Sequence, residues 1–265
     1  MKSTADGKRL RARWHIGALA LVFGIGVASA HASTTESSLM YTAAMPPSAD
    51  ASMLTARQRA IVPIAAFASA GDIGALNQAL NDGLDDGLTV NEAKEILVQL
   101  YAYAGFPRSL NALGELMKVV DARRARGVHD PAGNLPGNTA PTGDALLKAG
   151  TANQTRLAGA PVKGPLFEFA PAIDTYLKAH LFGDIFERDN LDWQSRELAT
   201  IGMLSALPGV ESQLQAHMRI GMNVGLGAGQ LRELTQVLAD RVGTDAALRA
   251  RSALEAQLAS MAGRQ

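Results

Sequence analysis

At 265 residues, with 47% hydrophobic and 19% charged residues, the chain can bury the core of one large domain or of two domains of about 100 residues each. Its formal charge is zero. Residues 1–32 hold five of the 25 basic and one of the 25 acidic residues, so the charge without them is −4. Because nucleic acids bind to basic faces, a nucleic-acid partner is not expected. Cysteine is absent, which excludes disulfides, thiol nucleophiles and thiolate metal ligands.

The N-terminus has the three parts of an export signal. Basic residues extend to Arg13, an apolar run follows, and Ala30 and Ala32 are the small residues of a cleavage site. The apolar run is too short for a comfortable membrane span. We therefore expect a signal peptide over residues 1–32, cleaved near Ala32 or Ala30, and a periplasmic or secreted product with no stable membrane span. An uncleaved anchor is the alternative.

A leader and a first helical unit follow the signal. Residues 33–52 are rich in Ser, Thr, Ala and Pro without sustained apolar periodicity, which predicts a disordered leader. Residues 53–126 predict four helices. Thr55 is a suitable N-cap for the first helix, and Pro63 inside its apolar pattern predicts that the helix starts or bends there. Thr89, with a glutamate three residues later, has the capping-box pattern for the third helix.

The fourth predicted helix runs from Ser109 to about Arg126, and its apolar periodicity predicts one inward face. That face comprises Leu110, Leu113, Met117 and Val120. Residues 127–170, rich in Gly, Pro, Asn and Thr, read as a connector with one short helix around 145–150. A connector of this length is either functional or covers a partner surface.

Residues 171–265 predict a second helical unit. It has a break at Leu207-Pro208-Gly209 and a final helix over 245–261 with Leu248, Leu254 and Leu258 on one face. Because no stretch alternates β-branched residues as a strand would, the sequence predicts an all-α protein.

Glu197 and His217 are the candidate acid/base pair, since they arrive on consecutive apolar helices 20 residues apart. Each has an ordinary alternative. Glu197 is expected in the first turn of its helix, where an acidic side chain favours the helix dipole, and a histidine on an apolar face is commonly structural. No two of the five histidines have the close spacing of metal ligands, such as HExxH, so no metal site is expected.

The chain also aligns with itself. A shift of 137 residues places Arg59 on Arg196, and after one inserted residue a shift of 138 places Glu95 on Glu233. Further aligned pairs are Leu54 and Leu191, Ile64 and Ile201, Leu76 and Leu214, Gly83 and Gly221, Gly87 and Gly225, Leu88 and Leu226, and Leu100 and Leu238. Two tandem helical units that cover each other's apolar faces are therefore expected. Glu197 aligns with Ala60 and His217 with Ala79, so the acid/base pair belongs to the second copy alone.

Four segments carry a resemblance to a known family. They are RELATIGMLSAL at 196–207, QLQAHMRIGMNVGL at 213–226, EAKEILVQLYAYAGFPRSLNAL at 92–113 and LFGDIFERDNL at 181–191. In them the chain resembles the carboxymuconolactone decarboxylase family, which includes the alkylhydroperoxidase D-like proteins. The resemblance implies tandem all-α units that assemble into trimers or hexamers, with the family's Glu and His at Glu197 and His217. Redox members carry a CxxC where this chain has Val210 and Gln213, so thiol peroxidase activity is disfavoured.

The resemblance implies a lyase-like or isomerase-like enzyme that acts on a small lactone or carbonyl compound by cofactor-free acid/base chemistry. His217 would exchange the proton and Glu197 would orient it. Arg196 or Arg219 would hold a substrate carboxylate, although either could instead be a solvated charge or part of an intersubunit salt bridge. Tyr101, with Tyr103 and Phe106, would line the pocket unless these are core aromatics. The alternative function is a non-catalytic helical binding or assembly module.

Overall fold

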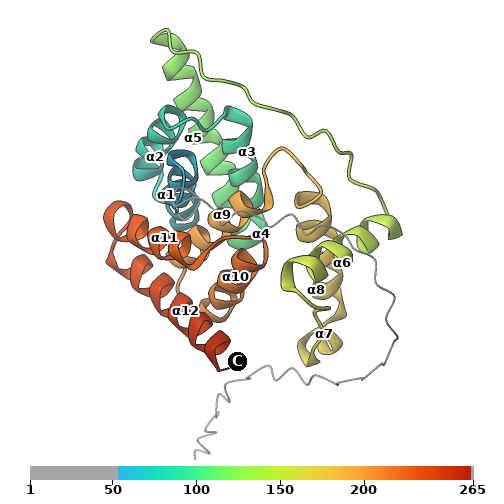
Figure 1. Ribbon diagram of the computed structural model, residues 1–265. Helices are drawn as coiled ribbons and strands as arrows, with labels where there is room; N and C mark the ends of the chain where they lie inside the picture. The colour runs from blue at the N-terminus through green and yellow to red at the C-terminus, as the bar shows by residue number, and fades with distance from the viewer. Residues whose placement is uncertain (1–52, 264–265) are drawn as a thin grey trace, which may run out of the picture. The chain divides into compact units, whose positions relative to one another are not determined.

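A computed structural model describes residues 53–263, so the predicted signal peptide and leader lie outside the described residues. Within this range the chain forms helices and connecting segments and no β-strand (Figure 1), which confirms the all-α fold class. Not one of these helices combines the length and the apolar character needed to span a bilayer.

The first half of the described chain contains five helices. They are α1 (Ala56–Ala70), α2 (Ile73–Asp85), α3 (Val90–Gln99), the single turn α4 (Tyr101–Ala104) and α5 (Phe106–Ala125). Thr55 caps α1 and Thr89 caps α3, as predicted, and the capping box predicted at Thr89 is confirmed. Thr55 also forms a capping box, with Gln58, which was not predicted. Because α1 begins at Ala56 and continues through Pro63, the helix does not start at the proline.

The second half begins inside the predicted connector. Its elements are α6 (Asp144–Ala158), α7 (Pro165–Phe169), α8 (Pro171–Tyr176), the π-helix η2 (Leu177–Ile185), α9 (Trp193–Ala206), α10 (Glu211–Asn223), α11 (Ala228–Arg241) and α12 (Thr244–Ala262). A short helix was predicted around 145–150, but α6 has 15 residues and extends to Ala158. The connector is also fastened to the first unit, because Pro131 and Ala132 accept hydrogen bonds from the backbone N–H groups of the first two residues of α3.

The internal repeat is visible in the helices themselves. The starts of α1 and α9 lie 137 residues apart, and those of α2 and α10, α3 and α11, and α5 and α12 lie 138 apart, which are the two shifts found in the sequence. α1 and α9 pack side by side. A Cβ on Gly202 of α9 would lie 2.8 Å from the backbone oxygen of Val62 and 3.3 Å from the Cβ of Ala65, the residue aligned with Gly202. The two units thus meet through equivalent positions.

Two ion pairs repeat the same symmetry. Arg59 of the first unit pairs with Glu233 of the second at 3.0 Å, and Arg196 of the second pairs with Glu95 of the first at 3.2 Å. The arginines are aligned with each other in the repeat, and so are the glutamates. The environments differ, because the side chain of Arg59 is 44% exposed whereas that of Arg196 is fully buried. Each unit therefore contributes an arginine to an equivalent salt bridge with the other unit, and only one of the two arginines is fully buried.

The apolar core has a large and a small part. The large part is formed jointly by the helices of both units. The small part gathers Leu157 of α6, Ile220 of α10 and four apolar residues at 181–186, with Tyr101 and Tyr103 packed against it. α6 and η2 cross at Gly150, where any side chain would meet the backbone oxygen of Lys178. The predicted connector thereby contributes core next to α10.

The predicted inward faces of two helices are partly wrong. On α5, Leu110 and Met117 are exposed, and Ala112, Leu116 and Val119 face the core instead. Both sets have helical spacing, so periodicity alone does not decide which stripe packs on α2 and α3. On α12, Leu254 is buried as predicted, whereas Leu248 is exposed and alanines on the neighbouring stripe fill its place. Alanines allow a closer approach of the helices than leucines would.

Candidate functional site

The break between α9 and α10 brings the predicted acid/base pair together. Leu207 ends α9 in an extended conformation, and Gly209 adopts φ +82°, a left-handed conformation that glycine reaches without strain. The chain therefore reverses over residues 207–210, and α10 packs against α9. Glu197 lies 10 residues before Leu207 and His217 lies seven residues after Val210, so the reversal brings the two side chains into contact.

Nδ1 of His217 lies 2.7 Å from Oε2 of Glu197. The glutamate side chain has no exposed surface, and the histidine side chain keeps 11% of its surface exposed. The prediction that Glu197 lies in the first turn is wrong, because α9 begins at Trp193 with Asp192 as its cap and has no acid in that turn. Placement at the helix dipole therefore does not explain Glu197. A carboxylate on Nδ1 fixes the orientation of the ring and leaves Nε2 for another partner.

Tyr103 from the first unit packs against the imidazole. The rings of Tyr103 and His217 meet edge to face, with centroids 5.7 Å apart and planes at 77°. Within residues 53–263 the buried Tyr103 hydroxyl has no hydrogen-bond partner, and neither has Oε1 of Glu197. Burial raises the pKa of Tyr103 strongly, and the charge of Glu197 raises it further. An interaction of the Tyr103 hydroxyl with that of Thr200 and the charge of Arg196 oppose this increase only in part. The hydroxyl is therefore a neutral donor.

A buried polar network fixes α3 and α4 against α9. Nε2 of Gln99 donates to the hydroxyl of Thr200 at 2.8 Å and to the carbonyl of Arg196 at 3.0 Å. The guanidinium of Arg196 donates to Glu95, to the side chain of Gln99 and to the carbonyl of Arg188. Burial by itself would raise the pKa of Glu95, but the hydrogen bond from Arg188 and the charge of Arg196 outweigh burial and lower it.

This buried network was not predicted from the sequence. A signal was present, since Glu95, Gln99 and Tyr103 recur every four residues and therefore share one side of a helix. Nothing in the spacing, however, shows that this side faces a buried arginine on a helix about 100 residues further along the chain.

In the described chain, the other predicted site residues, Arg196, Arg219, Tyr101 and Phe106, form no hydrogen bond or ring contact with the side chains of the pair. The guanidinium of Arg196 is bound within the chain, so it is poorly placed for a substrate carboxylate. Arg219 is half-buried, and its Nε has no partner among residues 53–263. Tyr101 stacks on Phe106 with centroids 4.6 Å apart, and Phe106 is 63% exposed. Tyr103 is thus the aromatic residue that contacts His217.

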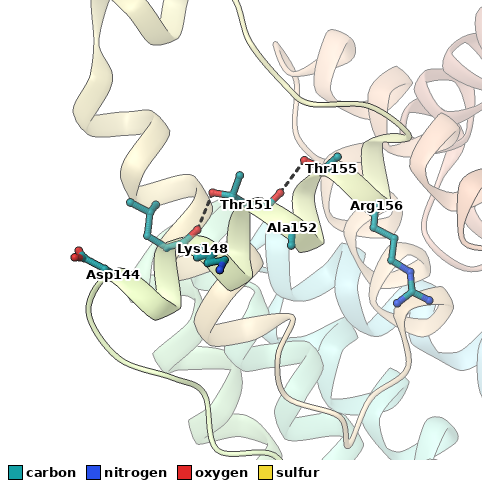
Figure 2. A pocket seen from close by; sticks show the side chains of 7 residues that line it. Asp144, Lys148, Thr151, Ala152, Thr155 and Arg156 are labelled. Carbon is teal, nitrogen blue, oxygen red and sulfur yellow. Dashed lines mark hydrogen bonds between the residues drawn. The ribbon is translucent and has the colours of Figure 1, made fainter.

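Two pockets on the described part of the chain are lined by residues other than Glu197 and His217. The first runs along one side of α6 (Figure 2), where the hydroxyls of Thr151 and Thr155 donate to carbonyls of the same helix. The second lies beside residues 186–193, where Arg156 stacks over Trp193 at 4.7 Å. In the chain from 53 to 263, no group of three or more acidic, histidine or cysteine side chains is arranged to hold a metal ion.

Comparison with known proteins gives one family. The family model described as Carboxymuconolactone decarboxylase family matches residues 40–117 and 171–256, which together make up more than half of the chain. The first region covers α1 to α4 and part of α5, and the second covers α8 to α11 and most of α12. The two matches therefore coincide with the two copies of the repeat. No curated protein matches the chain.

Proposed function

The chain belongs to the carboxymuconolactone decarboxylase family, and from this premise we propose that it is an enzyme that moves protons on a small lactone or carbonyl compound without a cofactor. The observation that carries the proposal is the 2.7 Å contact between Nδ1 of His217 and Oε2 of Glu197. A buried carboxylate that holds one nitrogen of a partly exposed imidazole is the arrangement of a general acid/base and its orienting group.

His217 exchanges the proton in this mechanism. In a decarboxylation, the bond between the ring carbon and the carboxylate breaks, and its electron pair moves through the conjugated system towards the lactone carbonyl oxygen. Nε2 of His217 then delivers a proton to carbon, while Glu197 balances the charge of the protonated ring. In an isomerisation, His217 takes a proton from one carbon and returns it to another. Proton transfer by a positioned side chain contributes about 10²–10⁴-fold to the rate.

A substrate carboxylate would be bound by Arg219 rather than by Arg196. No ion pair within residues 53–263 engages the guanidinium of Arg219, whereas Arg196 is paired with Glu95. Thiol chemistry is disfavoured, because the chain has no cysteine. Since residues 1–32 predict export, we also propose that the substrate is encountered outside the cytoplasm and is not the lactone that gives the family its name.

The second candidate function is a non-catalytic binding or assembly module. One observation favours it: neither of the two pockets described above is lined by Glu197 or His217. In this case the buried pair would serve only to join α9 to α10.

The test is a screen of small lactones and keto acids with the mature protein and with His217→Gln, following substrate loss and carbon dioxide release. The matched control is His180→Gln, because Nδ1 of His180 also contacts a carboxylate, that of Asp184, at 2.9 Å, but on the exposed surface. We expect His217→Gln to lose about 10²-fold or more and His180→Gln to keep full activity. A His217→Gln protein that folds normally and turns over the substrate at the wild-type rate would refute the role given to His217. A wild-type protein that binds a screened compound without converting it, with the same affinity as His217→Gln, would establish the binding-module alternative.

A further inference from the structure

The first helical unit lacks the acid/base pair but supplies the residue packed on it. Ala60 and Ala79 stand at the positions aligned with Glu197 and His217, and both are buried in the core. Tyr103 of the same unit lies edge to face on the imidazole of His217. The first unit therefore reaches into the site of the second.

Near this contact, one buried hydrogen-bond donor and one buried acceptor both lack a partner. Six buried side-chain polar atoms among residues 53–263 lack a hydrogen-bond partner, and they include Oη of Tyr103 and Oε1 of Glu197. Buried polar groups in folded proteins are nearly always bonded, so each unbonded one requires an explanation. The neutral tyrosine hydroxyl is a donor, and the carboxylate oxygen is an acceptor. Glu197 and Tyr103 both contact the imidazole of His217, which places the two groups around the same ring.

We propose that Tyr103 is a positioning residue of the site, whose hydroxyl donates through one bound water to Oε1 of Glu197, while Oε2 holds His217. The hydroxyl and the carboxylate are both buried, whereas the imidazole retains exposed surface. A substrate therefore meets His217, and Tyr103 acts behind it through Glu197. The hydrogen bond is inferred from the two unpartnered atoms and their shared contact with His217, and its effect on catalysis rests on the proposed function.

The interface between the units gives Tyr103 a fixed place. Gln99, one turn earlier, is bonded to Thr200 and to the carbonyl of Arg196, and Glu95 is paired with Arg196. These bonds set the side of α3 and α4 that carries Tyr103 against the side of α9 that carries Glu197. The first unit thus contributes a positioning residue to the site of the second unit.

Thermal unfolding of Tyr103→Phe, Glu197→Gln and the double variant tests the proposed bond without any substrate. We expect Tyr103→Phe to lower Tm by about 3–10 °C, because Glu197 loses its donor. In the Glu197→Gln background the loss should fall by at least half, because an amide oxygen accepts more weakly than a carboxylate. Tyr176→Phe, at an exposed tyrosine, is the matched control. A Tyr103→Phe protein as stable as this control, or more stable, overturns the proposal, as does an equal loss in both backgrounds.

A spectroscopic measurement separates positioning from packing. The proton between His217 and Glu197 gives a downfield resonance, assigned by its disappearance in His217→Gln. Tyr103→Phe keeps the aromatic ring, so packing alone leaves this resonance in place, whereas loss of the bond to Glu197 shifts or broadens it. An unchanged resonance overturns the positioning role. If the resonance and Tm change as expected but His217→Gln keeps its activity, the proposed function fails and the bond from Tyr103 stands.

Discussion

Replacement of Glu95 by glutamine removes the charge that pairs with the most deeply buried arginine of the fold. Arg196 has no exposed surface, and the side chain of Glu95 is only 3% exposed. Loss of one partner from a buried ion pair costs about 3–5 kcal/mol, because the other charge stays buried without compensation. We expect a value near the lower limit, about 3 kcal/mol, since the guanidinium keeps its bonds to Gln99 and to the carbonyl of Arg188. Tm should fall by about 6–12 °C.

The repeat supplies the control. Glu233 occupies the aligned position and pairs with Arg59 at 3.0 Å, but the side chain of Arg59 is 44% exposed and water can solvate its charge. Glu233→Gln should therefore cost about 1 kcal/mol or less. The assay is urea unfolding at pH 7, followed by circular dichroism, of both variants and the wild type. Equal losses from the two substitutions would refute the argument from burial.

The same pair predicts a pH dependence. The pKa of Glu95 in the folded protein lies below its ordinary value of 4.5, because Arg188 and Arg196 outweigh the effect of burial. Its ionised form therefore stabilises the fold fully above that ordinary value, and the stabilisation is lost as the pH falls through the lowered pKa. The difference in unfolding free energy between wild type and Glu95→Gln should stay constant from pH 7 to about pH 5 and shrink at lower pH. A difference that grows on acidification would contradict the assigned direction.

Three further substitutions test the packing and capping by thermal melts. Gly202→Ala should lose about 1–3 kcal/mol, because its Cβ would lie 2.8 Å from the backbone oxygen of Val62, and a neutral result would show that α1 and α9 pack less closely. Gly114→Ala, in the middle of α5 with no atom within 4 Å of the new Cβ, should gain about 0.5–1 kcal/mol, and a loss would place a neighbour there. Thr89→Ala should lose about 1 kcal/mol, because it removes the capping box that Thr89 shares with Glu92, and an unchanged Tm would make that cap dispensable.

The sequence predicted the features that depend on local chemistry. N-caps at Thr55 and Thr89 follow from side chains that bond their own backbone, and the break at Gly209 follows from residues that cannot continue a helix. The repeat was visible because both units use the same helices and glycines at shifts of 137 and 138 residues. The pair of Glu197 and His217 was found because two polar residues stood on apolar helices joined by a short turn.

Only the tertiary structure decided which side of each helix is buried and which residues from distant helices meet. Leu110 and Ala112 lie on stripes of equal periodicity, and contact with neighbouring helices decides between them. The bond from Arg196 to Glu95 and the contact of Tyr103 with His217 each join residues about 100 positions apart. Side-chain periodicity gives the possible packing faces of a helix but does not choose between them or identify the partner, so these contacts follow from how the two units pack.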